Sequence, residues 1–123
     1  MKAIRKSGED YLEAIYNLLS QDDHAHSADI ARALGVSKPS TFKAMQILAE
    51  EGYIVKEAYG AVTLTKKGRQ YAEAIRKKHN AIYTLLTEVL GVSPQNAEVD
   101  ACKIEHFIGE ETTQRLFEFL KLN

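Results

Sequence analysis

The sequence has one cysteine, no long apolar run and no strong net charge among its 123 residues. A single cysteine cannot form an internal disulfide, which fits a reducing cytoplasm. No segment approaches the roughly 18 apolar residues of a transmembrane helix, and no apolar stretch follows the basic N-terminus. We therefore expect neither a membrane span nor a signal peptide. A net charge of −1 means that no global basic field indicates nucleic acid.

Fixed-period repeats and low-complexity tracts are also missing. The composition, 45% hydrophobic and 27% charged, is that of one globular domain or of two small subdomains that share a core.

Residues 4–20 predict an amphipathic helix. Its apolar face is made of Leu12, Ile15, Tyr16 and Leu19. Asp10 and Glu13 point away from that face. They either form ordinary solvated surface or meet another element that needs two carboxylates, and both interpretations stay open at this point.

Two short helices follow. Ser27 is expected to cap a helix over residues 28–34 that Gly35 ends, and Ser37 is expected to cap a second helix that runs to about Glu51. The buried side of the second helix is expected to carry Thr41, Ala44, Met45 and Leu48. Two helices joined by a short turn with glycine indicate a helix-turn-helix, although a plain αα-hairpin has the same pattern.

The next segment favours the first interpretation. Residues 53–56 and 61–64 are strand-like, and residues 57–60 supply a turn between them. A helix-turn-helix followed directly by a hairpin predicts a winged helix and hence DNA binding. Residues 21–26, which lie before it, are expected to be a polar surface loop.

The DNA-contacting residues are expected at the exposed start of the second helix and in the wing. They are Ser37, Lys38, Pro39, Ser40, Lys43, Lys56 and Tyr59. Hydroxyl groups suit phosphates or base edges, and lysines suit phosphates or guanine. Phe42 could touch a thymine methyl, but we expect it to pack on the first helix of the pair.

The remainder predicts three helices. The first runs from residue 66 to about 90 with Thr65 as its N-cap, the second covers 95–108 and is ended by Gly109, and the third covers 111–122. Because so few helices cannot bury all of their apolar surface, a symmetric homodimer is the economical solution. His79 lies in the first of these helices, where a lone histidine is usually structural.

The most informative stretch of the sequence lies in the second of these helices. Cys102, Glu105 and His106 stand at i, i+3 and i+4, so in a helix they share one face, with Ile104, Phe107 and Ile108 on the opposite side. Thiol, carboxylate and imidazole groups together can hold a divalent transition metal. The plainer interpretation is a small buried cysteine beside two solvated polar residues, and this stretch alone favours it.

The sequence resembles the diphtheria toxin repressor family of metal-dependent transcriptional repressors, including its manganese-responsive branch. The resemblance covers nearly the whole chain. It is carried by residues 9–16 (Glu-Asp-Tyr-Leu-Glu-Ala-Ile-Tyr), by Leu64-Thr65-Lys66-Lys67-Gly68 after the wing, by His79 and by the Cys102, Glu105 and His106 spacing. It implies the metal ligands Asp10, Glu13, His79, Cys102, Glu105 and His106, with Glu98, one turn before Cys102, as a possible further ligand.

The resemblance also implies where the chain departs from the family. Asp10 and Glu13 match the manganese-responsive branch, whereas Cys102 matches the iron-responsive branch, in which a thiolate favours iron over manganese. The second metal site of the iron branch is altered, because Tyr83 and Glu98 stand at two of its positions. We expect Mn(II) or Fe(II) as the cofactor, with Zn(II), Co(II) or Ni(II) possible in vitro, and the short two-domain form that lacks an SH3-like domain.

The expected fold is mainly α with a small β-hairpin wing. An N-terminal winged helix-turn-helix is expected over residues 1–71, and a C-terminal helical dimerisation and metal-binding domain over 72–123. The expected function is a homodimeric repressor that binds double-stranded operator DNA when a divalent metal is bound and controls metal homeostasis genes. It needs no membrane and no organic cofactor, and it is not an enzyme.

Two alternatives remain from the sequence. One is a winged-helix regulator with a vestigial metal site that responds to another signal. The other is a metal hydrolase that uses the Cys102, Glu105 and His106 cluster. The second is disfavoured, because no separate general base is evident and the winged helix would be unexplained.

Overall fold

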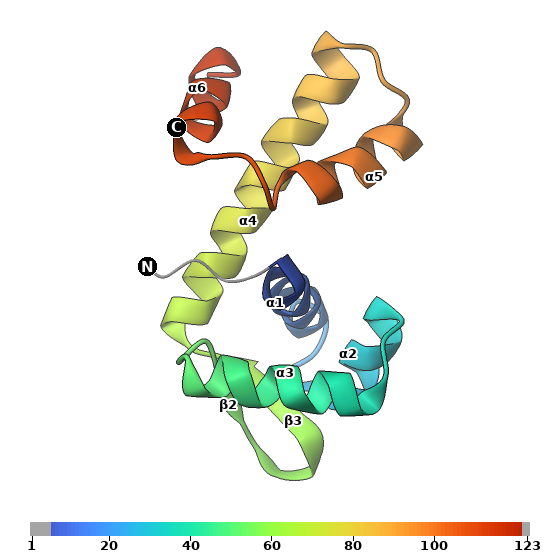
Figure 1. Ribbon diagram of the computed structural model, residues 1–123, viewed down its shortest axis with the longest axis vertical. Coiled ribbons are helices and arrows are strands. Elements are labelled where there is room, and N and C mark those ends of the chain that lie inside the picture. Colours follow the sequence, from blue (N-terminus) through green and yellow to red (C-terminus); the bar gives the residue numbers. More distant parts are fainter. Residues whose placement is uncertain (1–5, 122–123) are drawn as a thin grey trace. The chain divides into compact units, whose positions relative to one another are not determined.

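The computed structural model describes residues 6–121, which fall into two compact units that are divided between Glu73 and Ala74. The chain is mostly helical and contains one three-stranded antiparallel sheet, so the predicted fold class is confirmed (Figure 1). Residues 4–5 of the predicted first helix and residue 122 of the predicted last helix lie outside the described residues. Between residues 6 and 121, no helix combines the length and apolar character that crossing a membrane requires.

The N-terminal unit combines helices with the three-stranded sheet. Its elements are α1 (Lys6–Leu19), β1 (Ala25–His26), α2 (Ser27–Leu34), α3 (Lys38–Glu50), β2 (Ile54–Lys56), the 3-10 turn η1 (Ala58–Gly60), β3 (Ala61–Leu64) and the first part of α4 (Lys66–Thr84). The helix-turn-helix α2–α3 is followed by the β2–β3 hairpin, as the sequence predicts.

The strand β1 corrects the prediction of a plain loop over residues 21–26. Ala25 and His26 pair with Val62 and Ala61 of β3, and the sheet order is β1-β3-β2. Ala25 is buried while His26 is exposed. A two-residue strand is too short to show an alternating pattern in the sequence, so only its pairing with β3 reveals it.

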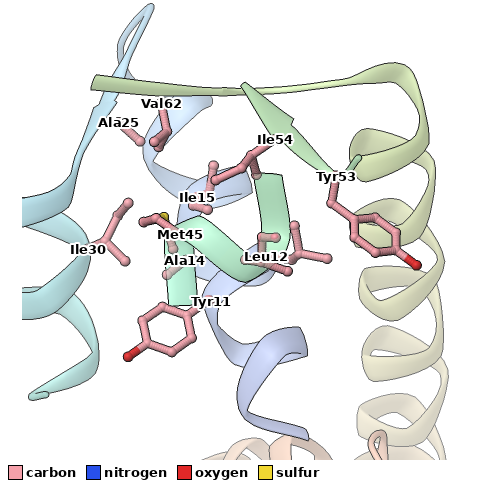
Figure 2. Close-up of a cluster of buried hydrophobic side chains, with 11 residues drawn as sticks. Tyr11, Leu12, Ala14, Ile15, Ala25, Ile30, Met45, Tyr53, Ile54 and Val62 are labelled. Carbon is pink, nitrogen blue, oxygen red and sulfur yellow. The ribbon is translucent and has the colours of Figure 1, made fainter. Parts of the chain in front are cut away.

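The core of this unit joins the helices to the sheet. Figure 2 shows Leu12 and Ile15 of α1, Ile30 of α2, Met45 of α3 and Val62 of β3 gathered in one apolar cluster. The predicted buried side of α3 is confirmed, since Thr41, Met45 and Leu48 are buried and Ala44 is half-buried. This packing fixes which face of α3 is left outward.

The helix caps follow the sequence with one exception. Gly35 has the left-handed φ of 66° that ends α2, and the Ser37 hydroxyl accepts a hydrogen bond from Ser40 N, so both predictions are confirmed. Ser27 is not the N-cap of α2: His26 takes that position, and the Ser27 hydroxyl donates to the carbonyl oxygen of Gly60 at 3.2 Å. Ser27 therefore ties α2 to the wing.

The junction between the wing and α4 explains the Thr65-to-Gly68 part of the sequence. Thr65 Oγ1 accepts from Gly68 N at 3.0 Å and donates to Gly52 O at 2.7 Å. Thr65 thus caps α4, as predicted, and holds the end of the hairpin against the turn after α3. A Cβ on Gly68 would overlap the carbonyl oxygen of Tyr53, so this close approach requires glycine.

The C-terminal unit contains the rest of α4, the π-helical turn η2 (Leu85–Val89), α5 (Pro94–Ile104) and α6 (Glu110–Phe119). The predicted helix over 66–90 therefore ends as an α-helix at Thr84 and continues as η2. The prediction of a helix over 95–108 is too long, because the chain forms a turn over 105–107. Gly109 stands at the N-cap of α6 rather than at the end of the preceding helix.

Candidate functional site

The start of α3 and the wing form the candidate nucleic-acid surface. Every residue predicted to contact DNA is exposed: Ser37, Lys38, Pro39, Ser40, Lys43, Lys56 and Tyr59. The first four of these begin α3, where the Ser37 hydroxyl lies 2.9 Å from the hydroxyl of Ser40. The tertiary fold thus leaves the predicted residues of α3 accessible to a ligand.

The wing presents a tyrosine at its tip. Tyr59 is 98% exposed and has a φ of 62°, an uncommon conformation for a residue with a side chain. Gly60 follows it, also with a positive φ. Two successive left-handed residues turn the chain sharply from β2 into β3, and the tight turn holds the Tyr59 ring outward in solvent.

Phe42 differs from its prediction. Phe42 is not buried against the first helix of the pair but is 56% exposed. The ammonium of Lys56 lies 4.9 Å from the centroid of its ring. At helical spacing, Thr41 and Met45 take the buried face of α3, which leaves Phe42 at the edge of that face. The sequence contains the spacing, but nothing in it shows that β2 brings a lysine to this ring.

The C-terminal unit contains a cluster of potential metal ligands around His79. The imidazole is 3% exposed; its Nδ1 lies 2.9 Å from Oε2 of Glu105 and its Nε2 lies 3.1 Å from Oε2 of Glu98. The hydrogen bond with Glu105 raises the pKa of His79 above its usual value, burial opposes this change, and the hydrogen bond with Glu98 adds to it. The histidine therefore joins α4 to α5 through charged partners.

Cys102 completes this cluster from the exposed side of α5. Its Sγ lies 3.9 Å from Nδ1 of His79, and one potential ligand atom from each of His79, Glu98 and Cys102 lies within 4.8 Å of the other two. Glu98 was only a possible ligand in the sequence, where its position one turn before Cys102 is the sole indication. The structure shows what the sequence could not, namely that Glu98 contacts His79.

Glu105 is the buried carboxylate of the cluster. It is 1% exposed and stands at the C-cap of α5. Its Oε1 has no hydrogen-bond partner among the described residues; Nε2 of His106 lies 3.5 Å away. A buried carboxylate oxygen without a donor is unfavourable for an isolated protein and suits a cation ligand.

His106 and Phe107 correct the helical-face argument. Because α5 ends at Ile104, His106 lies in the following turn and not on a continuing helix. Phe107, predicted on the apolar side opposite Cys102, Glu105 and His106, is 74% exposed. Cys102 and Glu105 nevertheless both lie beside His79, while Asp10 and Glu13 lie one turn apart on α1 in the N-terminal unit, both half-buried.

Comparisons with known proteins identify two family domains in this chain. The family model described as iron dependent repressor, N-terminal DNA binding domain, matches residues 4–62. The model described as iron dependent repressor, metal binding and dimerisation domain, matches residues 65–122. Together they cover almost the whole chain.

Individual relatives point in the same direction. The transcriptional regulator MntR of Escherichia coli O157:H7 is 39% identical over 111 residues, which cover 89% of this chain and 71% of that protein. An uncharacterised HTH-type transcriptional regulator of Methanocaldococcus jannaschii is 33% identical over 117 residues, which cover 94% of each chain.

Solved structures share the fold. IdeR of T. acidophilum superposes with a TM-score of 0.82 at 29% identity, and the match covers 99% of this chain and 56% of that one. A manganese-dependent transcriptional repressor in complex with manganese gives a TM-score of 0.83 at 28% identity, over 94% of this chain and 54% of that one. The chain thus spans about half the length of these solved proteins.

A winged helix-turn-helix followed by a helical unit with clustered potential metal ligands indicates a metal-responsive transcriptional regulator. The chain belongs to the family of iron-dependent repressors, the diphtheria toxin repressor family that includes MntR-type proteins. The resemblance stated from the sequence is confirmed. The protein is a metal-responsive transcriptional repressor and not an enzyme, so the hydrolase alternative is set aside.

Proposed function

We propose that this repressor binds operator DNA as a homodimer when Mn(II) or Fe(II) is bound, and that it controls genes of metal homeostasis. The family's DNA-binding domain and its metal-binding and dimerisation domain support DNA binding, metal binding and dimerisation. The single observation that carries it furthest is the cluster of His79, Glu98, Cys102 and Glu105 in the C-terminal unit.

The donor atoms of this cluster fit a divalent transition metal. Imidazole suits iron, zinc and nickel, carboxylates suit manganese, and a thiolate suits the softer ions. The buried Oε1 of Glu105 is a ready acceptor for positive charge. A bound cation would supply a charge that neutralises these carboxylates, and the ligand set that we propose comprises Asp10, Glu13, His79, Cys102, Glu105 and His106, with Glu98 added.

Asp10 and Glu13 belong to this set because of the family resemblance. They stand at i and i+3 on α1, so both carboxylates can serve one ion. Without a cation, their negative charges and that of Glu105 would repel one another if brought together. We propose that this repulsion disfavours the DNA-binding arrangement, and that the metal acts by binding that arrangement more tightly.

Cys102 makes the choice of metal specific to this chain. Its thiol stands where the manganese-responsive branch has a carboxylate, and this substitution favours Fe(II) over Mn(II). We therefore propose Fe(II) and Mn(II) as physiological candidates, with Zn(II), Co(II) and Ni(II) able to bind in vitro.

The proposed DNA contacts are the exposed residues of α3 and the wing. Lys38 and Lys43 would contact phosphates or guanine. Ser40, whose backbone N–H donates a hydrogen bond to the Ser37 hydroxyl, would contact phosphates or base edges. Pro39 would lie against the groove at the start of α3. Lys56 and the tip residue Tyr59 would contact the DNA backbone from the wing.

The proposal is tested by DNA-binding anisotropy under anaerobic conditions. Operator sequences are first selected from a random duplex library with metal-loaded protein. Binding is then titrated with Mn(II), Fe(II), Zn(II) and Co(II), and it should be lost on adding a chelator. Equal affinity with and without chelator would contradict the metal switch and favour the alternative of a vestigial site.

A matched pair of variants separates the site from a general charge effect. Glu105→Gln keeps the shape of the buried side chain but removes its charge, and should abolish the metal response. Asp100→Asn makes the same change at an exposed position of α5 and should leave the response intact. Retention of the response by Glu105→Gln would exclude Glu105 as a ligand.

A further inference from the structure

The aromatic ring of Phe42 is a large apolar group on the exposed surface of α3, where Ile47, further along the helix, is also exposed. Phe42 is 56% exposed, and its neighbours Lys38 and Lys43 on the same helix are exposed and polar. Exposing a phenylalanine ring to water is unfavourable, because removing apolar surface from water is stabilising. An exposed aromatic at the position of a DNA-contacting helix therefore suggests a ligand with an apolar group.

The ring borders a hollow between α3 and the wing. The hollow has a volume of about 230 Å³ and is lined by Phe42 and Met45 of α3, Lys56 of β2, and Gly60 and Val62 near the wing turn. All of these residues belong to the N-terminal unit. Most of the walls of the hollow are apolar, and Lys56, Glu57 and Ser27 contribute the polar groups.

The position of Lys56 is fixed by the same ring. Its ammonium lies 4.9 Å from the Phe42 centroid, within the range of a cation–π interaction. Glu57, the acidic residue beside it, has its carboxylate occupied by Thr63 Oγ1 at 3.4 Å and by Nε2 of His24 at 3.5 Å. The Lys56 ammonium beside the ring is therefore available to a phosphate, while the Glu57 carboxylate is held by Thr63 and His24.

We propose that Phe42 contacts the C5 methyl group of a thymine in the operator, while Lys56 contacts the adjacent phosphate. The thymine methyl is the apolar group that the major groove of DNA offers, and phenylalanine is one of the side chains that contact it. Cation–π contact holds the lysine beside the ring, so one structural pair supplies a base contact and a backbone contact. This inference rests on the proposed function, because it requires α3 to enter the major groove.

Replacing thymine by deoxyuridine tests the base contact, because deoxyuridine lacks only the methyl group. In the selected operator, each thymine is replaced singly and the affinity of the metal-loaded protein is measured. At the contacted position, the wild-type protein should lose about fourfold in affinity, the value expected for one buried methyl. The Phe42→Ala variant should bind the two duplexes equally.

The control is Ile47→Ala. Ile47 is an equally apolar residue of α3 with 48% exposure, and it should keep the full penalty of the wild-type protein for deoxyuridine. If every deoxyuridine penalty is the same in the wild-type protein and in Phe42→Ala, or if Ile47→Ala removes the same penalty, the thymine contact is wrong.

The phosphate contact has its own readout. Lys56→Met should weaken binding to all duplexes alike and should lower the slope of log affinity against log salt by about one, the value for a single lysine that binds a phosphate. An unchanged slope would overturn the phosphate contact.

Failure of this inference differs from failure of the proposed function. If metal-dependent binding occurs but does not depend on thymine methyls through Phe42, only the inference fails. If the metal-loaded wild-type protein retains no duplex from the library, the proposed function fails and the inference fails with it.

Discussion

His79 is a single imidazole with carboxylate oxygens at both ring nitrogens. Glu105 and Glu98 lie 2.9 and 3.1 Å from Nδ1 and Nε2, respectively. Ionised carboxylates only accept hydrogen bonds, so this arrangement is satisfied when both nitrogens carry protons. In the metal-free protein, the charged imidazolium thus stabilises the junction between α4 and α5 that the proposed metal would occupy.

The pH dependence of stability follows from the raised pKa of His79. Because its pKa in the folded state exceeds the usual value of 6.5, His79 stabilises the metal-free protein fully below that value. This contribution is lost as the pH rises through the folded-state pKa. Urea unfolding in the presence of a chelator should therefore show a free energy of unfolding that falls between mildly acidic and alkaline pH.

The control for this prediction is His79→Gln, which cannot gain a proton. Its free energy of unfolding should change less over the same range of pH. An identical change of the free energy of unfolding with pH in both proteins would show that groups other than His79 cause the pH dependence.

Cys102 is the residue that we propose sets the metal preference. It is exposed, and its Sγ lies 3.9 Å from Nδ1 of His79. Co(II) added to the wild-type protein should give a thiolate-to-metal charge-transfer absorption, which Cys102→Ser should lack. Cys102→Glu should shift the metal that activates DNA binding toward Mn(II), as measured by anisotropy. A charge-transfer band that persists without Cys102 would contradict thiolate ligation.

At the scale of elements, the junction from β3 to α4 attaches α4 to the winged helix. Thr65 links the N-terminus of α4 to Gly52, and the ammonium of Lys67 donates to the carbonyl oxygen of Glu51 at 2.8 Å. The start of α4 is therefore attached to the turn after α3. The short Thr65-Lys66-Lys67-Gly68 sequence therefore indicates the fold, because its contacts join α4 to the winged helix. It does not contribute to the candidate metal site.

Gly68→Ala tests this junction. The added methyl would overlap the Tyr53 carbonyl oxygen and force the backbone apart, which should lower the free energy of unfolding by about 1–3 kcal/mol. Arg69→Ala, at an exposed neighbouring position of α4, should change it by less than about 0.5 kcal/mol. Equal stability of Gly68→Ala and wild type, measured by chemical unfolding, would show that α4 and β2 can move apart without cost.

At the scale of the whole molecule, the described part of the C-terminal unit exposes several large apolar side chains. Val89 and Leu90 are 50% and 62% exposed near the end of η2, and Val99 is 52% exposed on the adjoining helix α5. The family assigns dimerisation to this part of the chain. We expect these side chains to be buried against a second copy of the protein.

Val99→Glu should therefore weaken the dimer. In a symmetric interface the substitution places an unpaired carboxylate on both copies, and the dissociation constant should rise by about 100-fold or more. Gln95→Glu adds the same charge at another exposed position of α5 and should have a smaller effect. Sedimentation equilibrium measures both, and an unchanged dimer with Val99→Glu would place the interface elsewhere.

The sequence by itself determined most of the helices, the hairpin, the caps at Ser37 and Thr65, and the family. These features depend on residue spacing within one element, and such spacing is written directly in the chain. It also brought together Cys102 and Glu105, which lie one turn apart.

Only the tertiary structure decided the contacts between elements. The pairing of β1 with β3, the exposure of Phe42 beside Lys56, and the contact of Glu98 with His79 join residues that no local pattern links. His79 and Glu105 are 26 positions apart, and their distance depends on the path of η2 and the following turn. The helical period sets which residues of one helix share a face. Contact between residues of different elements depends on how the connecting segments place those elements against each other.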